Sequence, residues 1–450
     1  AFIVTNSRYT ALSVKAVAAG SNQTFDDAST TNHTITVAGD TTASTFSPHR
    51  HGGYSAYFDG TGDYLTFPHS TSTAEWWNDD FTIEAWVYYT SFTESSEGRP
   101  HVLKHGDVGS TTDYWSFGAI SNGTLLFYYW NGGAIATCVS TSTLSLNTWH
   151  HITMCHDDSD NEINLYLDGV NVKTHTVSGT PQSSASSTMI IGNNTSSYFT
   201  GYMSNLRVIK GTEVYTSNFT PPTAPLTAIT NTKFLLGNLP YFKDQSTSNH
   251  AITPNGNVSL KPKSVFDNAP YSEASHGASA YFDGTGDYLT LSPQSDFAFG
   301  TGDFSVSLWV YFNEAENYDY LIDGRNSGQT TDTWSLSINF TNGAANKLMF
   351  ASIPSGGSAT AVLTSDTDFV TGQWYYISVS RSGTTSRMHF NGTQVAINTS
   401  DSTNYSTSPN TSYIGTRYSL QQYFDGYMCD VRVVKGTALS DYTPPTAPLT

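Results

Sequence analysis

The chain has 450 residues, of which 14% are aromatic, and its 37 acidic against 19 basic side chains give a formal net charge of −18. This charge repels phosphate backbones and anionic lipid surfaces, so nucleic acid is not expected as a partner. The sequence contains no run of about 18 apolar residues, and membrane insertion is therefore not expected either.

The sequence is a tandem duplication. Residues 56–66, AYFDGTGDYLT, return unchanged as residues 280–290, and PPTAPLT at residues 221–227 also closes the chain at residues 444–450. A residue kept in both copies is expected to serve the fold, whereas a residue found in one copy is freer to serve a task of its own.

Each repeat is about 225 residues long, which suits a single β-sandwich or barrel. We therefore expect two domains, residues 1–227 and residues 228–450, each with its own core.

Strand patterns dominate the chain, and helix patterns are nearly absent. Near the start of each repeat, residues 11–19 and residues 233–237 are apolar segments that we interpret as strands. Residues 81–88 and their copy, residues 304–311, alternate with period two, which predicts strands with one face in the core.

The shared motif DGTGD at residues 59–63 has the glycines of a phosphate loop but lacks the lysine and the following helix that such a loop requires. We interpret it as the tight turn of a hairpin, in which the glycines supply positive φ. Later, Asp168-Gly169 and Asn391-Gly392 each separate two short alternating runs, and they predict hairpins with two-residue type I′ turns.

These motifs, in this order, resemble the laminin G-like, concanavalin A-like lectin/glucanase jelly rolls. The resemblance rests on D-x-S-x-x-N-H at residues 27–33, AYFDGTGDYLT, the W-V-Y strand, W-H/Y-H/Y-I at residues 149–152 and GYM-x-x-x-RV-x-KGT from residue 201, all of which return in the second repeat. It implies an all-β chain of two tandem jelly-roll β-sandwiches. FDGTGDY, RV-x-KGT and the closing TPPTAP are especially similar to modules of tailed-bacteriophage virion proteins.

Some relatives hydrolyse β-glucans with two carboxylates on one strand, as in E-x-D-x-E, and retaining enzymes hold the two groups about 5 Å apart. Neither repeat has such a run, and Glu84 on the predicted strand is replaced by Ser307 in the second repeat. We therefore expect that the protein is not an enzyme, and a glycoside hydrolase is the least favoured function.

The resemblance also implies a structural calcium ion at a sheet margin. Its candidate ligands are Asp27, Asp244 and Asp430, because calcium takes carboxylate and carbonyl oxygens. Asn205 stands at the place of Asp430 in the first repeat. The alternative for Asp27 and Asp244 is a turn held by side-chain to backbone hydrogen bonds, and both interpretations stay open.

Carbohydrate binding needs exposed aromatic faces beside polar side chains. The candidates are the aromatic residues that differ between the repeats: Trp76, Trp77, Tyr128, Trp130, Tyr318, Tyr320 and Tyr423. The alternative for each is packing on the sandwich or against a neighbouring subunit.

We therefore predict a non-catalytic virion protein of a tailed phage, a capsid decoration or a tail or fibre component, whose two lectin-like modules attach to glycans or to a host surface. We expect it at the virion surface, as a homo-oligomer or in many copies, with other virion proteins and host-surface glycans as partners. The alternatives are a secreted bacterial adhesin or carbohydrate-binding protein and a purely structural decoration or connector subunit.

Overall fold

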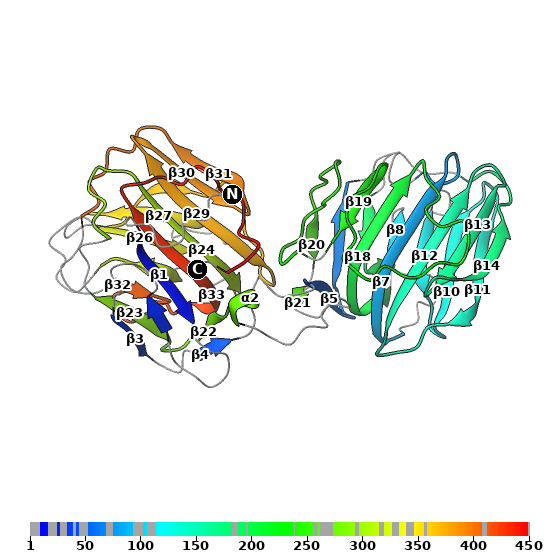
Figure 1. The fold of residues 1–450 in the computed structure, drawn as a ribbon, viewed down its shortest axis with the longest axis horizontal. Coiled ribbons are helices and arrows are strands. Elements are labelled where there is room, and N and C mark those ends of the chain that lie inside the picture. Colours follow the sequence, from blue (N-terminus) through cyan, green and yellow to red (C-terminus); the bar gives the residue numbers. More distant parts are fainter. Residues whose placement is uncertain are drawn as a thin grey trace. The chain divides into compact units, whose positions relative to one another are not determined.

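The computed structural model describes residues 10–16, 25–27, 34–38, 42–44, 53–68, 75–92, 102–105, 114–181, 188–194, 197–237, 239–255, 259–261, 273–292, 297–314, 319–325, 333–338, 346–354, 358–406 and 412–448. The chain forms two compact units (Figure 1). Residues 51–269 make the first, which we call the contiguous unit. Residues 1–50 together with 270–450 make the second, which we call the composite unit.

The contiguous unit is a sandwich of two antiparallel sheets. In its described part, an eight-stranded sheet has the order β14-β13-β12-β7-β18-β5-β21, with β19 also paired to β18, and a seven-stranded sheet has the order β11-β10-β9-β8-β15-β6-β20. The strands are β5 (Ser55–Asp59), β6 (Tyr64–Phe67), β7 (Phe81–Ser91), β8 (Leu103–His105), β9 (Trp115–Ala119), β10 (Thr124–Trp130), β11 (Ile135–Thr143), β12 (Trp149–Asp157), β13 (Glu162–Leu167), β14 (Val170–Thr176), β15 (Met189–Ile191), β18 (Thr200–Lys210), β19 (Thr232–Leu236), β20 (Thr253–Asn255) and β21 (Ser259–Lys261), besides the small pair β16 (Asn193–Asn194) and β17 (Ser197–Tyr198).

The composite unit repeats this architecture. Among its described residues, a nine-stranded sheet has the order β2-β1-β33-β24-β29-β30-β31, with β22 between β33 and β4, and a seven-stranded sheet has the order β28-β27-β26-β25-β32-β23-β3. The strands are β1 (Thr10–Ala16), β2 (Phe25–Asp27), β3 (Thr34–Ala38), β4 (Thr42–Ser44), β22 (Ser279–Asp283), β23 (Tyr288–Ser292), β24 (Phe304–Phe312), β25 (Tyr320–Asp323), β26 (Thr333–Ile338), β27 (Leu348–Ile353), β28 (Thr360–Thr364), β29 (Trp374–Ser382), β30 (Thr385–Phe390), β31 (Thr393–Asn398), β32 (Ser412–Ile414) and β33 (Asp425–Lys435).

A single helical turn, α2 (Glu273–His276), precedes β22. Within the described ranges, no helix has the length and apolar character needed to cross a bilayer. The predicted all-β jelly-roll class is confirmed.

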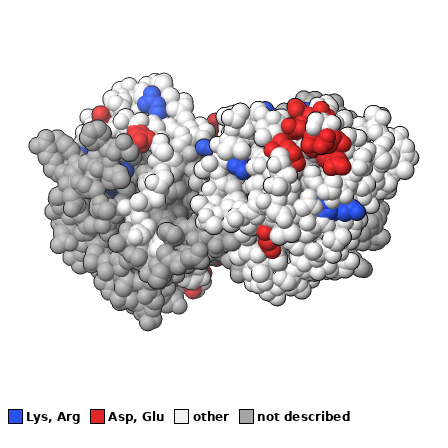
Figure 2. Space-filling model, turned by 45° about the vertical axis from the view of Figure 1, so that its right-hand side comes forward, with Lys and Arg blue, Asp and Glu red and all other residues white. Residues whose placement is uncertain are grey.

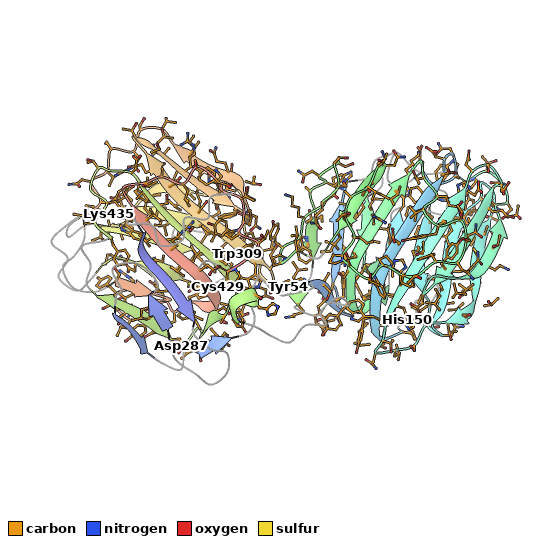
Figure 3. The ribbon with its side chains drawn as sticks, in the orientation of Figure 1. Tyr54, His150, Asp287, Trp309, Cys429 and Lys435 are labelled. Atoms are coloured by element: carbon orange, nitrogen blue, oxygen red, sulfur yellow. The ribbon has the colours of Figure 1, made fainter. Side chains whose placement is uncertain are left out.

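Both faces of the central strands are buried. On β7, Ile83, Ala85 and Val87 have no exposed surface, as the period-two pattern predicts, and neither do Thr82 and Glu84 on the opposite face. The outer face of the eight-stranded sheet must therefore be covered by another part of the chain. The composite unit is built in the same way: Trp309 of β24 and Cys429 of β33 are register partners and both are buried (Figure 3).

The two predicted type I′ hairpins are confirmed. Asp168 and Gly169 have φ of 51° and 78° between β13 and β14. Asn391 and Gly392 have φ of 48° and 86° between β30 and β31. Both turns need two successive residues with positive φ, which Asp-Gly and Asn-Gly supply at little cost.

The DGTGD motif is a turn but not a hairpin, so the predicted strand pairing is wrong. β5 pairs with β18 and β21 in one sheet, whereas β6 pairs with β15 and β20 in the other. The turn is a corner that carries the chain from sheet to sheet. Within it, the Asp59 amide donates to Asp63 Oδ2 at 2.9 Å and the Thr61 amide donates to Asp59 Oδ1.

The compact units do not coincide with the predicted domains 1–227 and 228–450, which are the repeats of the sequence. β19, from the start of the second repeat, pairs with β18 of the first, with Leu236 opposite Leu206. β1, from the start of the first repeat, pairs with β33 of the second, with Val14 opposite Val431. The opening strands of each repeat therefore complete the sandwich formed by the rest of the other repeat.

Candidate functional site

Residues 211–227 follow β18 and cross the outer face of the eight-stranded sheet, and we call them the closing segment. The Thr82 hydroxyl donates to Thr212 O at 3.1 Å. At the other side of the sheet, the Phe219 amide donates to Gly169 O at 2.8 Å. A Cβ at Gly169 would clash with the Phe219 carbonyl, so glycine in this turn serves both the positive φ and the close approach of the segment.

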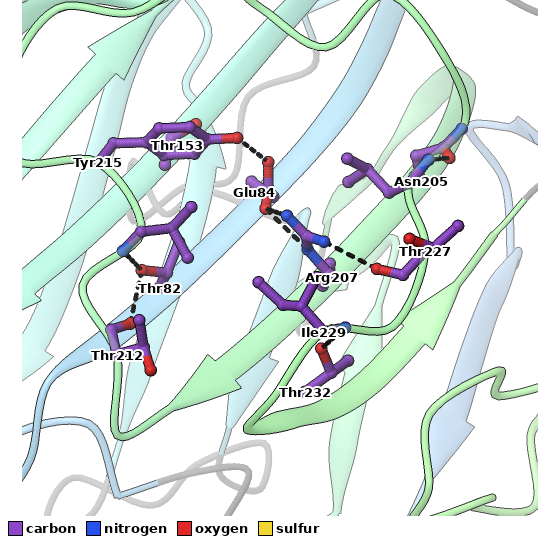
Figure 4. A network of polar contacts seen from close by, with 12 residues as sticks. Thr82, Glu84, Thr153, Asn205, Arg207, Thr212, Tyr215, Thr227, Ile229 and Thr232 are labelled. Atoms are coloured by element: carbon purple, nitrogen blue, oxygen red, sulfur yellow. Dashed lines mark hydrogen bonds and ion pairs between the residues drawn. The ribbon is translucent and has the colours of Figure 1, made fainter.

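A buried ion pair lies beneath the closing segment (Figure 4). Arg207 donates to Glu84 Oε1 from Nη2 at 2.6 Å and from Nε at 2.9 Å, and its Nη1 donates to Thr227 O at 2.8 Å. The Tyr215 hydroxyl donates to Glu84 Oε2 at 2.8 Å, and His151 Nε2 lies 3.2 Å from the same oxygen. Tyr215 and Thr227 belong to the closing segment, so the segment supplies part of the hydrogen bonding that these charges need.

The electrostatic balance favours the ionised form of Glu84. Burial alone would raise the pKa of this carboxyl, but the close contact with His151 and the charge of Arg207 outweigh burial and hold the pKa below its usual value. The charged pair is therefore present across the neutral range.

An acidic cleft opens between the closing segment and the β13–β14 hairpin, with a volume of about 610 Å³. Figure 2 shows Asp and Glu side chains gathered on one face of the contiguous unit, at the right of the view. The cleft is lined by carboxylates, amides and hydroxyls, and its lining includes no Lys or Arg: Asp157, Asp160, Glu162, Asn164, Tyr166, Asn171, Thr174, Glu213, Thr216, Ser217 and Asn218.

One wall of the cleft is a fixed network of amides. Thr174 Oγ1 donates to Asn164 Oδ1 at 2.6 Å, and Asn171 Nδ2 donates to the same oxygen at 3.1 Å. Across the cleft, Asn218 Oδ1 accepts a hydrogen bond from the backbone N–H of Asn171 at 2.8 Å, and this bond joins the closing segment to β14. These bonds set the positions of polar groups before any ligand arrives.

Two carboxylates of the cleft have opposite environments. Burial and the charge of Asp157 raise the pKa of Glu213 to about 6, and Glu213 Oε1 is buried with no hydrogen-bond partner among the described residues. Hydrogen bonds from the Ser159 side chain and from the backbone of residues 159 and 160 lower the pKa of Asp157. Glu213 is thus the carboxylate with an unused acceptor, whereas Asp157 is already engaged in its own turn.

The carboxylates of the cleft are specific to the first repeat. Asp157 pairs in register with Glu162, and the corresponding pair in the composite unit is Ser382 with Thr385. Glu213 corresponds to Ala438. Comparison of the repeats could have found these positions, but sequence reasoning looked for unshared aromatic residues and passed over unshared carboxylates.

Three of the predicted sugar-stacking residues are buried, which corrects that interpretation. Trp76 is 1% exposed, and Tyr128 is 6% exposed beside Tyr114. Tyr320 has no exposed surface, and Arg325 Cζ lies 4.9 Å from its ring centroid. Their faces pack on protein, so they cannot stack on a sugar in this structure.

The other aromatic candidates are spread over the two units and do not form one site. Trp77 and Trp130 are half-buried, and Tyr423 is half-buried with its hydroxyl donating to Leu420 O at 3.0 Å. Tyr318 lies outside the described residues. Trp77, Trp130 and Tyr423 do not line the acidic cleft, and the role of all four residues in glycan contact stays a prediction.

Of the predicted calcium ligands, Asp244 has the geometry of a turn. Its carboxylate accepts from the amides of Leu235 and Ser246 at 2.9 Å and from the His250 amide at 2.8 Å. His250 Nδ1 also lies 2.7 Å from Asp244 Oδ2. These donors occupy both oxygens and support the turn interpretation.

Asp430 lies at the β-bulge of β33 with φ of 51°, and its counterpart Asn205 has φ of 54°. Asp27 ends β2, and its side chain is outside the described residues. In the described ranges, no group of three or more His, Cys, Asp or Glu side chains is placed to hold a metal ion. Structural calcium stays a prediction.

The sandwich of paired antiparallel sheets defines each unit as a lectin-like jelly roll. The model of one family, the Concanavalin A-like lectin/glucanases superfamily, matches residues 59–238 and 283–441. The chain belongs to this superfamily. A search of curated protein sequences gave no match.

Solved structures with similar folds include domains LG4-5 of the mouse laminin α1 chain, with 11% identity over 88% of this chain and 92% of that chain and a TM-score of 0.30. A putative carbohydrate binding protein from Bacteroides ovatus shares 16% identity over 49% of this chain and 62% of that chain, with a TM-score of 0.34. Domain 4 of the arabinanase AbnA from Geobacillus stearothermophilus, solved with arabinotriose, shares 19% identity over 38% and 76%, with a TM-score of 0.29.

The Glu84→Ala variant is expected to lose about 3–5 kcal/mol of unfolding free energy, because Arg207 would stay buried without its carboxylate. The measurement is urea unfolding of the full chain at pH 7. Because the pKa of Glu84 is lowered, its contribution is complete above the value of 4.5 of an unperturbed glutamate and is lost as the pH falls through the folded-state pKa. Ser307→Ala, at the same place in the composite unit, is the control, and an equal loss there would contradict the role of the ion pair.

Proposed function

We propose that the protein is a non-catalytic attachment protein and that the acidic cleft of the contiguous unit binds a glycan. The observation that carries the proposal is the cleft itself: a preformed polar hollow, whose carboxylates occur in one repeat only, on a lectin-like sandwich that both repeats share. Residues kept in both repeats maintain the fold, and the cleft residues are the ones that differ.

The lining of the cleft suits a ligand rich in hydroxyl groups. The carboxylates of the cleft can accept hydrogen bonds from sugar hydroxyls, and the side-chain amides of Asn164 and Asn218 carry N–H donors. The one aromatic residue of the lining, Tyr166, is 1% exposed, so recognition rests on hydrogen bonds rather than on ring stacking.

Charge restricts the class of glycan. Four carboxylates without a lining cation repel sulfated, phosphorylated or uronic-acid sugars, and they favour neutral sugars or sugars that carry an ammonium group. The pKa of Glu213 is raised first by burial and then by the charges of neighbouring acids, Asp157 foremost.

As to setting, we propose a tailed-phage virion protein at the particle surface, where many copies would raise the avidity of a weak site. The support for this part is the sequence resemblance of the FDGTGDY, RV-x-KGT and TPPTAP motifs. A secreted adhesin would use the cleft in the same way. If the protein were a purely structural decoration subunit, the cleft would not be expected to bind a glycan.

The Glu213→Ala variant, which introduces the residue of the second repeat, is expected to weaken glycan binding by about 10- to 100-fold, because it removes a charged acceptor from the cleft. The measurement is a neutral-glycan array followed by titration calorimetry with the best ligand. Glu314→Gln removes an exposed carboxylate from the composite unit and is the control, expected to bind as the unmodified chain does.

Two results would contradict the proposal. Unchanged binding in Glu213→Ala would place the glycan outside the cleft. Release of reducing ends from a bound polysaccharide, lost in Glu213→Gln while binding persists, would show that the cleft is a glycosidase site rather than an attachment site.

Binding is expected to weaken about tenfold between pH 7 and pH 5, with a midpoint near the pKa of about 6 of Glu213. The sign follows from the raised pKa: the carboxylate that accepts sugar hydroxyls is ionised above this value and is protonated below it. Calorimetry across the pH range provides the measurement. The profile of Glu213→Gln should be flat, and an equal pH dependence in that variant would assign the titration to another group.

The virion setting has its own measurement. Mass spectrometry of purified phage particles is expected to detect the chain in stoichiometric amounts, and its presence only in the secreted fraction of a bacterial culture would favour the adhesin. This result is independent of glycan binding.

A further inference from the structure

The opening strands of each repeat act as a separable building block, which we call the front segment. In the contiguous unit the front segment is β19, β20 and β21, and in the composite unit it is β1, β3 and β4. We call the rest of each sandwich its body. Each front segment pairs with three strands of a body. These strands are β18, β6 and β5 in the contiguous unit and β33, β23 and β22 in the composite unit.

The two front segments use equivalent registers. In the contiguous unit, Leu260 of the front segment lies opposite Ala56 of the body. In the composite unit, Ala43 lies opposite Ala280, which is the copy of Ala56 in the repeated AYFDGTGDYLT motif. The two bodies therefore receive their front segments in the same register.

The two units differ in where the front segment comes from. The contiguous unit takes it from the chain that directly follows its body, within residues 51–269. The composite unit takes it from the other end of the chain, since residues 1–50 complete a body that begins at residue 270. The composite unit therefore combines the front segment of the first repeat with the body of the second repeat.

A body without its front segment would expose three unpaired strand edges, which readily accept a strand from another chain. In a single chain, the front segment stays tethered to the body through the contiguous unit, which favours closure within the chain at low protein concentration. At comparable protein concentrations, the front segment of another copy makes the same backbone hydrogen bonds, so the two closures differ little in energy.

From these observations we infer that β1, β3 and β4 are a donor segment and that the edges of β33, β23 and β22 are its acceptor surface, which a second copy of this chain can fill. Exchange links copies head to tail through the composite unit and leaves the contiguous unit, with its cleft, unchanged. The partner is a second copy because the acceptor surface is matched in register to the front segment of this sequence.

Engineered cysteines test the exchange in the full chain. Cα partners on antiparallel strands are about 4.5–5.5 Å apart, within the range that a disulfide bridges. The single variants Ala43→Cys and Ala280→Cys are unfolded together, refolded at rising protein concentration and oxidised. The expected product is a disulfide-linked dimer of one copy of each variant, identified by peptide mapping, with a yield that rises at least tenfold between micromolar and millimolar protein.

Two controls test the interpretation, and the native cysteines are not expected to interfere. The double variant Ala43→Cys/Ala280→Cys, refolded dilute, should form the disulfide within one chain. Ala43→Cys refolded with Ala56→Cys should give no such dimer, because Ala56 pairs with Leu260. The native Cys138, Cys155 and Cys429 are buried, and burial raises the pKa of the first two thiols to about 12, so they react slowly.

Two results would overturn the inference. If the mixed single variants stay monomeric at every concentration while the double variant closes within one chain, the front segment does not exchange. If the double variant Ala43→Cys/Ala56→Cys closes instead, the front segment belongs to its own repeat and the acceptor surface is wrongly assigned. Neither result depends on glycan binding.

Discussion

The buried pair of Glu84 and Arg207 is the constraint on which the site of the contiguous unit depends. Removing two charges from water is costly, and their attraction offsets the cost only when the remaining donors and acceptors are also satisfied. Here Tyr215 and Thr227 satisfy them, and both belong to the closing segment. Displacement of the segment from the sheet would therefore expose the two charges to water or leave them buried without these hydrogen-bond partners.

The acidic cleft follows from this anchoring. Glu213, Thr216, Ser217 and Asn218 lie on either side of Tyr215 in the sequence, so the hydroxyl bond to Glu84 fixes the wall that they form. The opposite wall is the β13–β14 hairpin, whose Asp-Gly turn contacts the segment through Gly169. Two shared scaffold elements thus hold a set of side chains that only one repeat has.

In the composite unit the equivalent segment, residues 436–448, is held without a carboxylate at the place of Glu84. There Ser307 replaces Glu84, and the Ser305 hydroxyl donates to Thr437 O at 2.9 Å. The Tyr442 ring stacks on His389 with centroids 3.6 Å apart. Since the fold itself does not need the buried charges, their presence in the contiguous unit is consistent with a segment whose position matters for more than stability.

Much of the fold could be predicted from the sequence because strand and turn signals are local. Period two placed residues 81–88 in a strand, and Asp168-Gly169 placed a type I′ turn. The DGTGD corner was misassigned because a turn motif does not encode which sheet accepts the next strand. The cleft was missed for a similar reason: Asp157 and Glu162 are neighbours on one hairpin, but Glu213 lies far from them in the sequence and joins them only through the closing segment.

The pairing of front segments with bodies could not be predicted from the sequence either, because the two repeats are similar. Both bodies receive their front segments in the same register, so the alternative pairing would offer the same positions for backbone hydrogen bonds. The chain segments that join the front segments to the bodies then decide between the two pairings. The free energy of loop closure changes by only about 0.6 kcal/mol for each doubling of loop length. Small differences in the chain between repeats can therefore select one pairing, and the same near-equality leaves the front segment open to a body in another copy.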